Sequence, residues 1–216
     1  MADSPFPAVP LLNLLTMAAL IVGVFNPDAR RYTHRIATAY QGGSPVRGLS
    51  AVTLAVAGHC VVTAMVGTLA AILAWAILGF NRPVVLAATA AGCLMSGLAQ
   101  LVRAAYGGWS TRKRPGESSE ASTASAIYGF VLTPCRPALV LFFASPLVGS
   151  RAFALVSAAF ASATIAAVMV QAALVLGRHD RRYFFESEAA CRVIVGVFLS
   201  LVSFIVLSRF WIPSNG

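Results

Sequence analysis

Long apolar runs alternate with short polar connections along the whole chain. The runs cover residues 9–25, 49–80, 84–106, 124–147, 152–177 and 190–210. A helix needs roughly 20 apolar residues to cross a bilayer. The second run is about 32 residues long, which predicts a tilted or overshooting helix, because two spans and a turn would not fit. The pattern therefore predicts an all-α polytopic membrane protein with six transmembrane helices.

The composition favours a membrane domain over a soluble one. Of the 216 residues, 58% are hydrophobic and 11% are charged, whereas a soluble domain carries roughly 25% charged residues. We expect residues 1–216 to form one membrane domain in the lipid bilayer, with a retained first helix instead of a cleaved signal peptide. The net charge of +9 raises nucleic acid as a partner. No basic stripe is interleaved with aromatic residues, so no nucleic acid is expected.

The basic residues are concentrated in alternate connections between the runs. The opposite side holds only Arg82, Arg151 and Arg209. The positive-inside rule therefore predicts cytoplasmic basic loops and external termini, in a bacterial-type plasma membrane. Residues 29–48 carry part of this charge and predict a short amphipathic helix at the membrane surface. The basic side holds 12 residues: Arg30, Arg31, Arg35, Arg47, Arg103, Arg112, Lys113, Arg114, Arg178, Arg181, Arg182 and Arg192.

Two proline-containing stretches interrupt this apolar pattern at matching places. Asn26-Pro27 follows the first run, and Thr133-Pro134-Cys135-Arg136-Pro137 lies inside the fourth run. The halves of the chain match in order at an offset of about 106 residues, which predicts repeat one at 9–106, a cytoplasmic loop at 107–122 and repeat two at 124–211. Three spans per repeat make the second repeat inverted, an architecture in which solutes bind at interrupted helices. Two ordinary proline kinks in a packed bundle are the alternative.

The candidate site residues gather around these two breaks. An imidazole within a span is a functional hypothesis by default, so His59 is a candidate metal ligand, a proton relay or a polar helix contact. Cys135 is the second candidate metal ligand, and Cys60 is expected to face another side of its helix. Asp28 binds a cation or pairs with a neighbouring arginine. The candidate substrate-binding residues are Asn26, Asp28, Thr133 and Arg136.

The residues around the second break resemble a known family. The run from Thr133 to Leu141, followed by Val148-Gly149-Ser150-Arg151 and an alanine-rich helix, resembles the second half of NicO-type nickel/cobalt exporters. Asn26-Pro27, the segment 39–49 and His59 look like the corresponding part of the first half. A wider set that includes LysE-like, sulfite-exporter-like and CcdA-type proteins shares the duplicated three-helix plan. The resemblance implies export of a divalent metal, with imidazole and thiolate as suitable ligands.

The leading hypothesis is a small secondary transporter that exports a divalent metal cation or another small solute. The expected partners are the bilayer, the solute or metal ion, and further copies of the chain or a larger membrane complex. No resident cofactor is expected, since the metal would be cargo. The alternatives are an accessory or structural subunit of a membrane complex and a thiol-redox membrane carrier. An enzyme is not expected, because the sequence has no paired intramembrane carboxylates, HExxH or Ser/His arrangement.

Overall fold

The structure is a computed structural model, and it describes residues 8–40, 43–78, 81–110, 123–177 and 182–211. These residues are helical apart from short connections, which confirms the all-α prediction. Six stretches are long and apolar enough to cross a membrane. The predicted number of spans is therefore confirmed. Their bounds are Pro10–Ala39, Pro45–Ile77, Pro83–Tyr106, Thr123–Ala144, Arg151–Leu176 and Glu188–Ser208.

Two of the six spans are each built from two helices. The first span contains α1 (Ala8–Val24) and α2 (Pro27–Ala39), and the fourth contains α5 (Thr123–Leu132) and α6 (Arg136–Ala144). Both interruptions fall at the prolines, because proline lacks the N–H that a helix requires and clashes with the preceding turn. The continuous helices are α3 (Pro45–Leu78), α4 (Arg82–Ser110), α7 (Ser150–Leu176) and α8 (Arg182–Trp211), and a 3₁₀ turn, η2 (Ser145–Leu147), follows α6.

The first break corrects one of the sequence predictions. Asn26-Pro27 was expected to end the first span, and residues 29–48 to hold a helix at the membrane surface. Instead, α2 continues the first span and packs against α7, α5 and α3. Thr33, Ile36 and Ala37 are buried, so the apolar face of α2 is covered by protein. The predicted loop 107–122 is also shorter at its start, because α4 continues to Ser110, and residues 111–122 lie outside the described residues.

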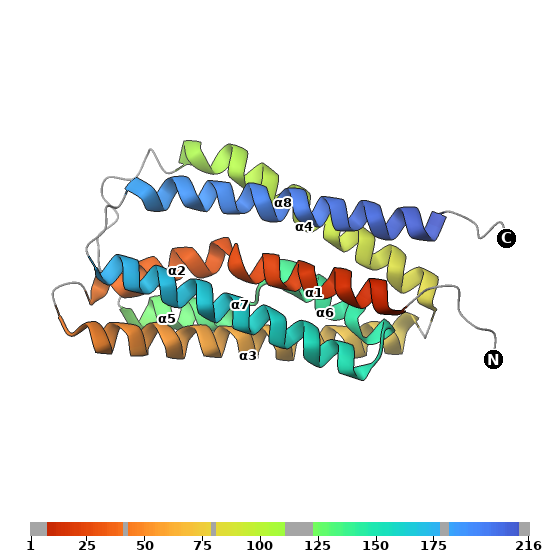
Figure 1. Ribbon diagram of the computed structural model, residues 1–216, viewed down its shortest axis with the longest axis horizontal. Helices are drawn as coiled ribbons and strands as arrows, with labels where there is room; N and C mark the ends of the chain where they lie inside the picture. The colour runs from red at the N-terminus through yellow and green to blue at the C-terminus, as the bar shows by residue number, and fades with distance from the viewer. Residues whose placement is uncertain (1–7, 41–42, 79–80, 111–122, 178–181, 212–216) are drawn as a thin grey trace.

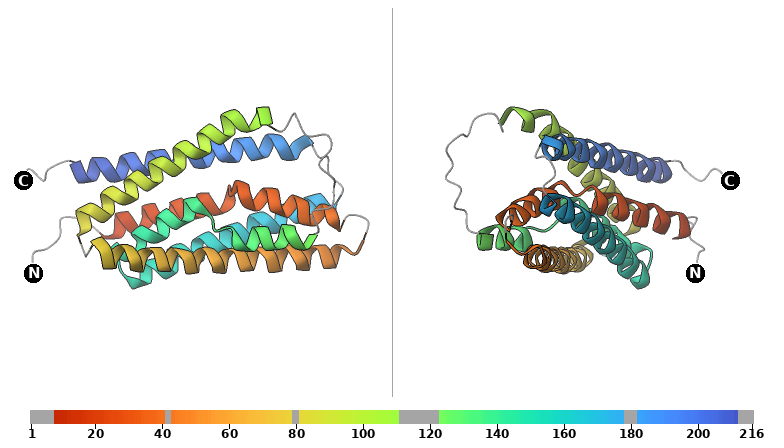
Figure 2. Two further views of the ribbon diagram at one scale, coloured as in Figure 1. Left: turned by 180° about the vertical axis from the view of Figure 1, so that it is seen from behind. Right: turned by 60° about the vertical axis from the view of Figure 1, so that its left-hand side comes forward.

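The helices form two layers that share a common direction (Figure 1). α4 and α8 lie side by side in one layer, the α4–α8 pair, and the remaining helices form the other (Figure 2). The start of α1 and the end of α8 lie at one end of the bundle, which we call the terminal end. The other end, where α2, α4 and α7 finish, is the basic end, since exposed Arg35 lies in the last turns of α2 and exposed Arg47 in the first turn of α3.

Small residues bring the two helices of the α4–α8 pair into close contact. A Cβ atom added to Gly97 would lie 2.6 Å from Ser200 Oγ and 2.7 Å from the carbonyl oxygen of Gly196. Seven residues away on α4, the carbonyl oxygen of Ala90 accepts a hydrogen bond from Ser203 Oγ at 2.7 Å. Small residues commonly permit such approach in lipid, where packing and interhelical hydrogen bonds hold helices together.

Gly97→Ala is expected to destabilise the protein by about 1–3 kcal/mol, because the added methyl group overlaps backbone that cannot move aside easily. Unfolding in detergent, followed by circular dichroism, measures this loss. Gly129→Ala is the matched control, since its added Cβ would lie 3.4 Å from the nearest atom, a ring carbon of Tyr32. If Gly97→Ala and Gly129→Ala are equally stable, the close contact between α4 and α8 is wrong.

Candidate functional site at the two helix breaks

The second break leaves a backbone carbonyl without its helical donor, and His59 takes that place. In a continuous helix the carbonyl oxygen of Phe130 would accept from the N–H of residue 134, but Pro134 has none. The Nδ1 atom of His59 on α3 lies 3.1 Å from this oxygen. A carbonyl oxygen can only accept, so Nδ1 must carry the hydrogen. The proline thus explains why a histidine is fixed in this orientation inside the membrane.

The second nitrogen of His59 is buried without a hydrogen-bond partner among the described residues. His59 is 1% exposed, and its Nε2 atom is one of the unsatisfied buried polar atoms. With the hydrogen on Nδ1, the neutral ring keeps a lone pair on Nε2. Buried polar atoms are normally paired, and an exception requires an explanation such as a functional role or a missing ligand. Nε2 is therefore the group on which a cation or a hydrogen-bond donor would bind.

Further contacts hold the second break against α3. The backbone N–H of Cys135 donates to Thr63 Oγ1 at 3.1 Å, and Thr133 Oγ1 donates to the carbonyl oxygen of Gly129 at 2.6 Å. The ring of Phe130 stacks on His59 with centroids 4.4 Å apart and on Tyr32 with centroids 5.3 Å apart. These contacts connect α2, α3 and the second break, so the imidazole has little freedom to turn.

The first break is capped by its own asparagine. Asn26 Oδ1 accepts hydrogen bonds from the backbone N–H groups of Asp28 at 3.2 Å and Ala29 at 3.1 Å, which satisfies the start of α2. The side-chain Nδ2 atom of Asn26 is buried and has no partner among the described residues. Asn26 was predicted to bind substrate. Its oxygen is used by the cap, so Nδ2, a donor, is the atom available for that role.

The two helix breaks lie on spans that pack against each other. α2 packs against α5, and α1 packs against α6, so the two interrupted spans lie against each other in opposite directions. The structure thus places His59 against the second break, which contains Thr133 and Cys135, whereas Asp28 lies at the first break on the neighbouring span.

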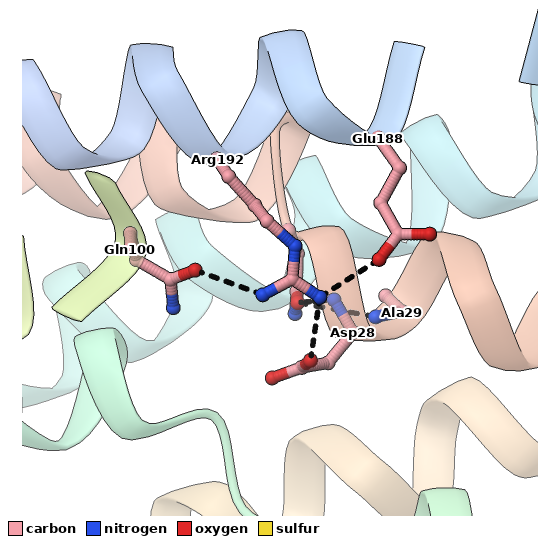
Figure 3. Close-up of polar contacts among 6 residues, drawn as sticks. Asp28, Ala29, Gln100, Glu188 and Arg192 are labelled. Carbon is pink, nitrogen blue, oxygen red and sulfur yellow. Dashed lines mark hydrogen bonds and ion pairs between the residues drawn. The ribbon is translucent and has the colours of Figure 1, made fainter. Parts of the chain in front are cut away.

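Asp28 also takes part in a polar network that sequence reasoning did not find. One guanidinium nitrogen of Arg192 lies 3.9 Å from Asp28 Oδ1 and 2.7 Å from Glu188 Oε1. The other donates to Gln100 Oε1 at 3.3 Å (Figure 3). Asp28 was expected to bind a cation or to pair with Arg30 or Arg31, and its observed ion-pair partner is on α8. The i, i+4 spacing of Glu188 and Arg192 was a visible signal for their pair, but nothing local indicated Asp28.

Two other residues differ in their surroundings. Arg136 begins α6 and is exposed, and within the described residues no carboxylate forms an ion pair with it. Cys60 was expected to face away from the site. It is buried on α3, three residues before Thr63, whose hydroxyl accepts the hydrogen bond from the backbone N–H of Cys135. All four cysteines are free.

The described residues contain no group of three or more His, Cys, Asp or Glu side chains arranged to hold a metal ion. Comparison of the chain with profiles of known families, with curated proteins and with solved structures finds no significant match. The site is therefore interpreted from its own geometry.

Proposed function

We propose that this chain is a small secondary transporter whose solute binds where the two interrupted spans meet. The observation that carries the proposal is the buried, unpartnered Nε2 of His59, which is held at a helix break. Irregular backbone inside a bilayer is tolerated where protein buries it or where it lines a cavity, and transporters use such breaks as binding sites.

The contacts between α4 and α8 support an inverted repeat in this transporter. Gly97 lies against Gly196, and Ser203 is hydrogen bonded to Ala90. The offset of 106 residues seen in the sequence relates these two contacts. Adding 106 to residue number 97 gives 203, and subtracting 106 from 196 gives 90, so the contact of Gly97 with Gly196 is equivalent to that of Ser203 with Ala90. A two-fold axis between the repeats would produce this exchange of partners.

The contacts of the two broken spans are related by the same offset. Gln171 Nε2 on α7 donates to the carbonyl oxygen of Arg30 on α2 at 2.9 Å. Adding 107 to residue number 30 gives position 137 in the second repeat. Subtracting 106 from residue number 171 gives position 65 in the first repeat. The hydrogen-bonded residues Cys135 and Thr63 lie two residues earlier on each of the equivalent helices, so the register is unchanged. Each broken span thus packs in the same way on the second helix of the other repeat.

The distribution of arginines between the two ends of the bundle indicates which end faces the cytoplasm. The basic end carries the exposed side chains of Arg35, near the end of α2, and Arg47, at the start of α3, whereas Arg151 is exposed at the start of α7, at the terminal end. The positive-inside rule then supports a cytoplasmic basic end and external termini in a plasma membrane. Glycosylation or reporter fusions at the two ends measure this orientation independently of transport.

The solute is a divalent metal cation or another small polar solute, because the lone pair on Nε2 of His59 can bind a cation or accept a hydrogen bond. The test is uptake into liposomes that contain the purified protein. Ni²⁺ and Co²⁺ are followed with an entrapped fluorescent chelator, and a set of radiolabelled small polar solutes is assayed in parallel. We expect at least one solute to accumulate faster than in protein-free liposomes. If none does, the transporter proposal is wrong.

Pro134→Ala tests whether the break itself is needed. The alanine supplies an N–H to the carbonyl oxygen of Phe130, which lets α5 continue and competes with His59 for its acceptor. We expect the uptake rate to fall by roughly tenfold or more, the equivalent of 1.4 kcal/mol, with thermal stability unchanged or raised. Pro146→Ala, in the turn after α6, is the control and should transport normally. Normal uptake by Pro134→Ala would contradict a role for the break.

The redox alternative has one supporting observation: Cys60 and Cys135 are buried, free cysteines, and α3, which carries Cys60, is hydrogen bonded through Thr63 to the backbone of Cys135. Such a carrier needs these two cysteines to form a disulfide. Oxidation followed by alkylation and mass spectrometry detects that bond. Its absence, together with normal uptake by Cys60→Ala, would remove the redox alternative without affecting the transporter proposal.

A further inference from the structure

The repeats differ in one contact at the basic end. α1 packs against α8 at the terminal end. The equivalent contact in the other repeat would join α5 to α4, and within the described residues no comparable contact between them exists. Figure 2 shows α4 running away from α5 toward the basic end, whereas α4 stays close to α6. One face of α5 is therefore left without the cover that α1 has.

The exposure of three pairs of equivalent residues shows the same difference between the repeats. Tyr128 and Leu132 on α5 are 67% and 68% exposed, and Arg136 at the start of α6 is exposed as well. The positions 107 residues earlier are Ile21 and Phe25, which are partly buried, and Ala29, which is 1% exposed.

The charge of Arg136 indicates what lies against this face. Arg136 is inside the fourth span, at the break, and within the described residues no carboxylate pairs with it. A charged side chain in the middle of a bilayer is costly when it faces lipid, and it is normally found where water or protein surrounds it. Water therefore fits this face better than lipid chains.

We propose that Tyr128, Leu132 and Arg136 line a water-filled entrance between α4 and α5, which leads from the basic end to the second break. The structure is then the state of the transporter that is open at the basic end and closed at the terminal end by the contact of α1 with α8. The identification of this structure as one state of a transporter rests on the proposed function. Closing α4 onto α5 while α1 leaves α8 would give the opposite state, with Phe25 and Ala29 facing water.

Labelling of an introduced cysteine with a membrane-impermeant methanethiosulfonate tests the entrance. Leu132→Cys is compared with Val61→Cys, which is 57% exposed on α3. The two lie at the same depth, because α3 contacts the second break at Gly58 and at Thr63, on either side of Val61. Peptide mass spectrometry identifies the modified residue, which separates it from the buried native cysteines.

We expect Leu132→Cys to react at least about tenfold faster than Val61→Cys, because a thiol reacts as the thiolate, which forms in water and not in lipid. The reaction should occur only from the side on which Arg47→Cys reacts and not from the side of Arg151→Cys. Phe25→Cys should remain unreactive from both sides. Equal slow reaction of Leu132→Cys and Val61→Cys would mean that lipid covers α5, and rapid reaction of Phe25→Cys would mean that the terminal end is not closed.

Hydroxyl-radical footprinting of the unaltered protein is the second measurement, in case a cysteine variant does not fold. Leu132 should be oxidised and Val61 should not, and equal oxidation would overturn the entrance. Neither measurement needs a solute. A wet entrance without uptake of any solute would contradict the proposed function alone, whereas uptake with a lipid-covered α5 would contradict the entrance alone.

Discussion

His59→Ala should lower the uptake rate by roughly tenfold or more, while the protein still folds and inserts. The variant loses the lone-pair nitrogen that we propose for solute binding. It also removes the side-chain donor of the Phe130 carbonyl oxygen, which keeps only the hydrogen bond from the backbone N–H of Thr133 at 3.4 Å, and this loss costs about 0.5–1.5 kcal/mol of stability. Uptake by reconstituted protein and thermal unfolding in detergent separate the two effects.

His59→Gln distinguishes binding from structure. The glutamine amide can donate to the carbonyl oxygen of Phe130, so stability should largely return, but the imidazole nitrogen is still missing and uptake should stay low. Cys93→Ala, a 0% exposed position on α4, is the control for losing a buried group, and it should transport normally. Normal uptake by His59→Ala, or recovery of uptake by His59→Gln, would contradict the site.

Arg192→Gln is expected to destabilise the protein clearly. It removes the cation shared by Asp28 and Glu188, whose side chains are 29% and 19% exposed, and leaves both carboxylates uncompensated. We expect a loss of about 1–3 kcal/mol, between the values of exposed and fully buried ion pairs. Unfolding in detergent measures it.

Neutralising the partners tests the cause of that loss. In the triple variant Arg192→Gln, Asp28→Asn and Glu188→Gln no unpaired carboxylate remains, so most of the lost stability should return. Arg31→Gln, at an exposed position on α2, is the control and should change stability by less than about 0.5 kcal/mol. If the triple variant is no more stable than Arg192→Gln, the ion pairs are not what holds α8 to the first break.

The spans and breaks were predictable because their causes are local. Apolar runs of spanning length must lie in the bilayer, and Pro27 and Pro134 interrupt helices wherever they stand. The interpretation of residues after Asn26 as a surface helix was wrong, because the packing that covers these residues is not local in the sequence. The charges of Arg30, Arg31 and Arg35 were visible in the sequence, but the protein that covers Thr33, Ile36 and Ala37 was not.

The candidate site was predictable in part. A histidine in an apolar run was informative on its own, and His59 does lie at the second break. Its bond to the carbonyl oxygen of Phe130 joins residues 71 positions apart. No sequence pattern specifies such a pairing, and the same is true of the hydrogen bond from the backbone N–H of Cys135 to Thr63.

By itself the sequence determined a six-span helical membrane protein with two interrupted spans, because hydropathy, length and proline chemistry act within a few residues of each other. Only the tertiary structure decided which polar groups meet. It joined His59 to the second break, Asp28 to Arg192, and left Arg136 exposed. These outcomes depend on helix register and on which faces neighbouring helices cover, and both arise from packing between segments far apart in the chain.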